Sequence, residues 1–169
     1  MKDLQSRDSQ VVPIAEKHIE SYYECLNSVA RERRYLAFVQ APQKESVREY
    51  VLSNIKNEIP QFVALSEEEV IGWCDITPLS LAGFTHCGEL GMGVRDSFRR
   101  MGIGTRLVEQ TIQKAKEQGI ERVELEVFRT NNPAIRLYEK IGFVVEGEKK
   151  KARKLDGIYD NLVLMAKFI

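Results

Sequence analysis

The stretch from Val94 to Thr105 contains residue types that bind anions. Two arginines, Arg99 and Arg100, precede two glycines, Gly102 and Gly104. Apolar residues then recur at the spacing of one helical face, which predicts a helix that starts near Gly102. The first turn of a helix presents backbone N–H groups without helical partners, and glycine lets an anion approach them closely. The stretch therefore has the features of a phosphate cradle.

The spacing alone leaves a second interpretation open, because a Gly-x-Gly before a helix is often only a tight turn. The better-known phosphate loops do not match. A Walker loop needs Lys and then Ser or Thr after its last glycine, and the dinucleotide fingerprint needs a third Gly or Ala where Leu107 stands. A phosphate site here must be of another kind.

Apolar spacing predicts eleven elements around this stretch, in the order β-α-α-β-β-β-α-β-α-β-β. We expect Ser46 and Asn132 to be helix N-caps, Pro133 to open its helix, and His18 to lie on a helix surface. The basic run 149–154 is expected to form an exposed hairpin. The predicted elements cover 11–15, 16–30, 46–57, 62–65, 70–76, 87–94, 102 to a cap at 119, 123–127, 133–141, 143–148 and 161–168.

Two of the predicted strands have unusual compositions. Strand 87–94 contains three glycines, and glycine inside a strand often marks a bulge or a close backbone approach. Strand 123–127 alternates apolar with acidic residues, so that Glu124 and Glu126 share one face while the other face is buried. These strands flank the predicted central helix.

Length and composition favour one domain over residues 1–169, because the chain is long enough for one well-buried core and short for two. Twenty-five basic and twenty-five acidic residues give a formal net charge of zero, so no general attraction to nucleic acid or membrane is expected. Three cysteines without Cys-x-x-Cys spacing suggest buried free thiols and no metal site. With no apolar run of the ~20 residues that span a bilayer, a cytoplasmic protein is expected.

Two motifs together resemble the GNAT superfamily of acetyl-CoA-dependent N-acetyltransferases. The first is Arg99-x-x-Gly102-x-Gly104 after a strand that ends at Val94. The second reads Asn131-x-x-Ala134-x-x-Leu137-Tyr138-Glu139-Lys140-x-Gly142-Phe143. The resemblance runs from about Val63 to the C-terminus. It implies an α/β fold with a central mixed, mostly antiparallel twisted sheet, helices on both faces, and a strand 87–94 that splays from its neighbour.

The resemblance also implies how acetyl-CoA is bound. The backbone of the splayed strand pairs with the pantetheine arm, the helix N-terminus holds the pyrophosphate, and an Asn hydrogen-bonds the cofactor near the open end of the splay. Two arginines add charge at the rim. The residues implied are Met92, Gly93 and Val94 for pantetheine, Arg99, Arg100, Met101, Gly102, Ile103, Gly104 and Thr105 for pyrophosphate, and Asn131 at the open end.

Acetyl transfer needs a proton for the thiolate, removal of a proton from the amine, and a donor for the oxyanion. Tyr138 occupies the family's general-acid position, although its spacing alone would indicate a core aromatic. Glu126 is the first candidate for the base and Glu89 the second, with water or desolvation as alternatives. A backbone N–H in the glycine-rich bulge near Met92 or Gly93 would stabilise the oxyanion. The acceptor would contact Glu32, Arg33, Trp73 and Tyr159.

The expected function is transfer of acetyl to the primary amine of a small molecule such as an amino acid. A protein N-terminus or lysine is the alternative acceptor, since the Glu126 to Tyr138 spacing resembles that of ribosomal-protein acetyltransferases. A non-catalytic CoA-binding regulatory module is a third hypothesis, and nucleic-acid binding by the run 149–154 a fourth. Because dimers are common in the superfamily, a homodimer is also open.

Overall fold

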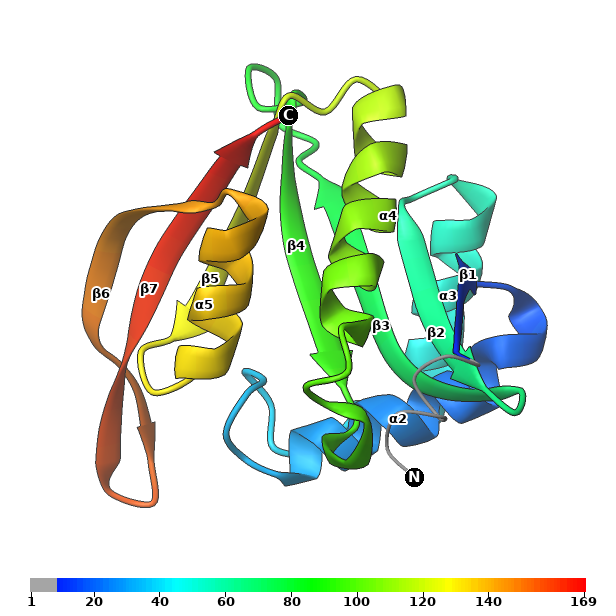
Figure 1. Ribbon diagram of the computed structural model, residues 1–169, viewed down its shortest axis with the longest axis horizontal. Helices are drawn as coiled ribbons and strands as arrows, with labels where there is room; N and C mark the ends of the chain where they lie inside the picture. Colours follow the sequence, from blue (N-terminus) through cyan, green and yellow to red (C-terminus); the bar gives the residue numbers. More distant parts are fainter. Residues whose placement is uncertain (1–8) are drawn as a thin grey trace.

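A computed structural model describes residues 9–169 as a seven-stranded sheet flanked by helices (Figure 1). The strand order is β1-β2-β3-β4-β5-β7-β6, and all neighbours are antiparallel except the parallel pair β4–β5. This confirms the predicted fold class and element order. The elements are β1 (Gln10–Pro13), η1 (Glu16–His18), α2 (Ile19–Arg31), α3 (Lys44–Lys56), β2 (Gln61–Ser66), β3 (Glu69–Pro78), β4 (Cys87–Val94), η2 (Asp96–Phe98), α4 (Ile103–Glu117), β5 (Arg122–Phe128), α5 (Asn132–Ile141), β6 (Val144–Leu155) and β7 (Ile158–Phe168).

The helices divide between the two faces of the sheet. Helices α4 and α5 cover one face, and α2 and α3 cover the other (Figure 1). Successive strand residues point to opposite faces, so Cys74 and Ile76 of β3 join the core under α4 and α5, whereas Trp73 joins the core under α2 and α3. Asp75 therefore projects toward the α2/α3 face.

Strands β4 and β5 splay apart, as expected. They pair only at Cys87–Arg122, Gly88–Val123 and Glu89–Glu124, although both strands continue beyond these pairs. Figure 1 shows the two strands diverging from their shared end. From Leu90 onward, the edge of β4 that faces β5 has no strand partner among residues 9–169, so its backbone groups can pair with an extended ligand.

Both predicted N-caps were wrong. Helix α3 is capped by Gln43 because the Val47 N–H already bonds the Gln43 carbonyl, at 3.1 Å, which places Ser46 inside the helix. Helix α5 is capped by Asn131, whose side-chain oxygen accepts the Ala134 N–H at 3.3 Å. The cap in each case depends on where the first helical hydrogen bond closes.

The basic run 149–154 is mostly exposed, as expected, and lies in β6, one arm of the β6–β7 hairpin, whose turn falls at Asp156 and Gly157, where both residues have positive φ. Two further expectations need correction. His18 is buried and not on a helix surface; its Nδ1 accepts the Ala15 N–H at 3.0 Å, and burial lowers its pKa. Strand β4 pairs with β3 without a register shift, so it contains no bulge.

The three cysteines are free and buried, as predicted. Within residues 9–169, no helix combines the length and apolar character needed to cross a membrane. The same residues hold no group of three or more His, Cys, Asp or Glu side chains placed to bind a metal ion.

Candidate active site

The N-terminus of α4 is built to receive an anion. Gly102 is the N-cap with a φ of +75°, and no described side chain bonds to the cap. The first backbone bond of the helix runs from Arg106 to Gly102, so the N–H groups of Ile103, Gly104 and Thr105 precede it and point outward along the helix axis. This arrangement fits the pyrophosphate of a CoA molecule.

The two glycines of the motif are required for different reasons. Gly102 needs its left-handed conformation, and an added Cβ there would meet nothing within 4 Å. At Gly104, an added Cβ would lie 2.9 Å from Leu137 Cδ1 of α5 and 3.2 Å from Met92 Cε of β4. Gly104 therefore lets α4, α5 and β4 pack closely beside the splay.

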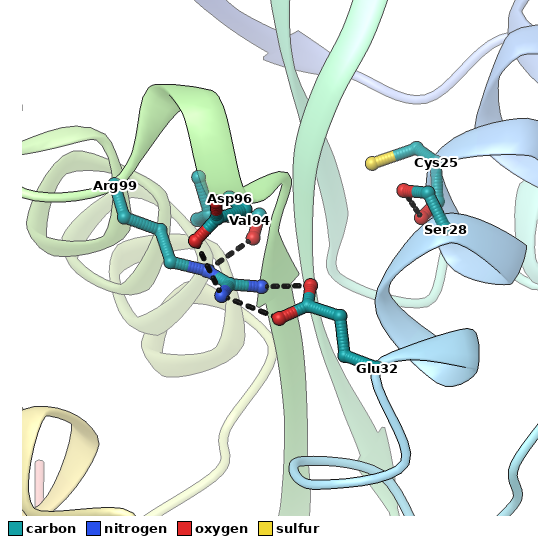
Figure 2. A network of polar contacts seen from close by, with 6 residues as sticks. All are labelled: Cys25, Ser28, Glu32, Val94, Asp96 and Arg99. Carbon is teal, nitrogen blue, oxygen red and sulfur yellow. Dashed lines mark hydrogen bonds and ion pairs between the residues drawn. The ribbon is translucent and has the colours of Figure 1, made fainter.

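Arg99, which the sequence predicted at the rim of the phosphate cradle, is held by a network of polar contacts. Its guanidinium bonds both carboxylate oxygens of Glu32, at 2.8 and 2.5 Å, and the Asp96 carboxylate at 3.2 Å (Figure 2). Its Nε donates to the Val94 carbonyl at 2.8 Å, and the guanidinium lies 4.6 Å from the centre of the Tyr35 ring. Two acidic side chains thus face the Arg99 cation, whereas Arg100 is exposed.

Glu32 and Arg33 lie side by side in the loop after α2 and are tied to opposite sides of the splay. Glu32 bonds Arg99 on the β4 side. Arg33 pairs with Asp156 in the β6–β7 turn at 2.6 Å. We call this two-residue bridge the strap. Tyr159, the other acceptor candidate on this hairpin, is exposed and lies beneath Lys151 and Lys154.

The proton-transfer candidates lie on opposite faces of the sheet. Tyr138 projects from α5 into the core on the α4/α5 face, with its ring centre 5.6 Å from that of Phe143. Burial raises the pKa of its phenol, so Tyr138 keeps its proton at neutral pH and can serve only as an acid. Glu126 lies between the buried Leu125 and Val127, faces the other way, and pairs with Lys149.

Strand β4 carries three of the residues predicted to contact the cofactor. Met92, Gly93 and Val94 follow the last β4–β5 pair, on the free edge of β4. Trp73 is only 3% exposed and packs over Gly93, where an added Cβ would lie 2.3 Å from the indole ring. Trp73 is thus a core residue rather than the lining of an open pocket. Glu89 is exposed on the same face as Gly91 and Gly93.

Sequence reasoning missed Asp75. Its carboxylate is buried, accepts a hydrogen bond from the Tyr50 hydroxyl at 3.1 Å, and lies beside Glu89 on the α2/α3 face. Burial raises the pKa of this carboxyl to about 6. The available signal was an aspartate inside the apolar run 70–76, since a charge is seldom buried without a reason.

Comparisons with known proteins agree with this geometry. The model of the acetyltransferase (GNAT) family matches residues 19–143. The L-amino acid N-acetyltransferase AaaT of Escherichia coli is 31% identical over 110 residues, which are 64% of this chain and 68% of the relative. An N-alpha-acetyltransferase of Saccharolobus solfataricus is 33% identical over 120 residues, which are 63% of this chain and 67% of the relative.

The fold also recurs in solved structures. A GNAT superfamily phosphinothricin acetyltransferase from Sinorhizobium meliloti, in complex with AcCoA, superposes with a TM-score of 0.89 at 16% identity. The match covers 96% of this chain and 89% of that one. Because the family model spans most of the chain and the fold agrees, the chain belongs to the GNAT family of acetyltransferases.

Proposed function

We propose that this acetyltransferase transfers the acetyl group of acetyl-CoA to the primary amine of a small molecule, an amino acid or a related amine. We choose this class of acceptor because of the strap, in which Glu32 and Arg33 join the β4 side to the β6–β7 turn across the splay. A bridge at that position favours a compact acceptor over a continuous peptide. The relative AaaT, named for L-amino acid acetylation, supports the same class.

The free edge of β4 and the N-terminus of α4 would form the binding site for acetyl-CoA. Met92, Gly93 and Val94 would pair with the pantetheine arm, and the N–H groups from Arg100 to Thr105 would hold the pyrophosphate. Asn131 is less available than expected, since its side-chain oxygen already caps α5. Acetyl-CoA supplies the thioester that the amine attacks.

The reaction then requires two proton movements. A base on the α2/α3 side, for which the sequence offered Glu126 and Glu89, accepts the proton of the bound ammonium, and the free amine attacks the thioester in a ternary complex. A backbone N–H near Met92 or Gly93 stabilises the oxyanion. Tyr138 then gives its proton to the departing thiolate. Acid and base thus act from opposite faces of the sheet.

Acetylation of a protein N-terminus is the second candidate. It is favoured by the relative named as an N-alpha-acetyltransferase. This function would require the exposed ion pair between Arg33 and Asp156 to open so that a chain can enter. The two functions therefore differ in what the strap must do.

The test is CoA release from acetyl-CoA, followed with a thiol-reactive dye, against amino acids, polyamines, aminoglycosides and short peptides. We expect release with a small amine. Faster release with peptides would select the second candidate. Acetyl-CoA binding without release for any acceptor would indicate a regulatory module.

A further inference from the structure

We infer that Asp75, in place of Glu126 or Glu89, is the carboxylate that takes up the acceptor's proton, and that the Tyr50 hydroxyl carries the proton to it. The inference deepens the proposed function and rests on it. Tyr50 is the group that touches the amine. Asp75 acts through Tyr50 and is a positioning residue. Together they form a route from the acceptor side of the splay to a buried proton acceptor.

The first observation is that one hydrogen bond joins a buried group to the surface. Asp75 is 8% exposed, whereas Tyr50 of α3 is 39% exposed. The Tyr50 hydroxyl donates to Asp75 Oδ2 at 3.1 Å. The hydroxyl can accept a second proton while it donates its own to Asp75, because an O–H group has both a donor and acceptor lone pairs.

The second observation is that Asp75 lies against the free part of β4. Asp75 is in register with Gly91, and a Cβ added to Gly91 would lie 3.0 Å from Asp75 Oδ1. Gly91 is exposed although Leu90 and Gly93 beside it in β4 are buried. It directly precedes Met92, whose Cα is about 3.8 Å away. The carboxylate is therefore close to the backbone where the thioester is proposed to lie.

The groups that face Asp75 set its affinity for a proton. Glu89 of β4 is a like charge, Tyr22 of α2 and Tyr50 of α3 are neutral phenols, and the β2 residue in register, Gln61, is uncharged. None of the ion pairs of residues 9–169 includes Asp75. Burial first, and then Glu89, raise its pKa, while Tyr50 and the Gly91 backbone lower it, to about 6. Such a carboxylate is ionised at pH 7 yet accepts a proton readily.

The proton balance is complete within these groups. The ammonium N–H bond breaks as its proton passes to the Tyr50 oxygen, and the Tyr50 proton passes to Asp75 Oδ2. The nitrogen keeps the electron pair with which it attacks the thioester. Burial raises the pKa of Tyr50 to about 12, so it relays as a hydroxyl rather than as a phenolate. After acetyl transfer, Asp75 returns its proton to solvent by the same route.

The test is the pH profile of kcat/KM for the best small acceptor. We expect the wild-type profile to show an acidic limb near pH 6. Asp75→Asn should abolish that limb and lower kcat/KM about 10²-fold at pH 7. Tyr50→Phe should lower kcat/KM and move the limb to higher pH, because its hydroxyl holds down the pKa of Asp75. Glu89→Gln should move the limb to lower pH without removing it.

A matched control and two contrary outcomes complete the design. Asp160→Asn removes another shielded carboxylate, paired with Arg153 at 3.4 Å, and should leave the limb in place. An Asp75→Asn enzyme that folds and keeps the limb would overturn the inference. If that variant does not fold, an unchanged profile for Tyr50→Phe would overturn it. Absence of transfer by the wild-type enzyme would instead remove the proposed function, and this inference with it.

Discussion

The two faces of the sheet beside the splay differ in chemistry. The α4/α5 face is an apolar core that contains Tyr138, a phenol that burial keeps protonated. The α2/α3 side carries the carboxylates of Asp75, Glu89 and Glu126. With the sheet between the phenol and the carboxylates, each can exchange its proton with the reacting groups in the splay.

The largest effect should come from filling the space that β4 leaves on the α2/α3 face. Gly93→Ala would place a Cβ 2.3 Å from the rigid Trp73 ring, so we expect a loss of about 3 kcal/mol in the free energy of unfolding. Urea denaturation measures it. Gly147→Ala is the matched control, because its Cβ would meet only Leu164 Cδ1, at 3.6 Å. Equal losses in the two variants would contradict this packing role.

Asp75 should make the stability of the protein sensitive to pH. Since the pKa of Asp75 is raised from 3.8 to about 6 in the folded state, the native protein binds a proton that the unfolded chain has released between these values. Stability contributed by this group therefore falls as pH rises from about 4 to about 6, by about 3 kcal/mol. Asp75→Asn should lack this fall in urea denaturation across that range. Parallel curves for both proteins would refute the assignment.

Tyr138 provides the corresponding test of the α4/α5 face. Tyr138→Phe keeps the ring in the core but removes the acid, so we expect kcat to fall about 10²-fold with the dissociation constant of acetyl-CoA unchanged. Steady-state kinetics and calorimetric titration measure the two quantities. A variant with wild-type kcat would leave Tyr138 as a packing residue only.

The smallest effect should come from the strap, which spans the splay at the surface. Glu32→Gln removes the charge opposite the half-buried Arg99, and we expect the acceptor KM to rise about fivefold, or about 1 kcal/mol. Asp156→Asn weakens the more exposed pair with Arg33 and should change KM less than twofold. If Asp156→Asn raised the acceptor KM more than Glu32→Gln did, acceptor binding would depend on the β6–β7 turn instead.

The sequence predicted the features that depend on local patterns. Apolar spacing and glycines located the helices, the strands and the splay, because these follow from periodicity and family motifs. The partner of Arg99 could not be read in this way, since Glu32 lies 67 residues earlier in the chain. The predicted N-caps lay one to three residues from the observed N-caps, because neighbouring polar residues compete for the same N–H groups and the backbone decides among them. The sequence shows Asp75 inside an apolar run, but its burial and its hydrogen bond to Tyr50 depend on how α3 packs against the sheet.

The position of the basic run in β6 also determines how the sheet ends. Strand β6 is one edge of the sheet and β1 is the other. Lys149, Lys150 and Lys151 are exposed on β6, and β1 is a four-residue strand that ends at Pro13. Lysines, a short strand and proline each oppose the addition of a strand from another molecule. The ends of the sheet are thus protected against edge-to-edge aggregation, and a homodimer would have to form through faces or helices.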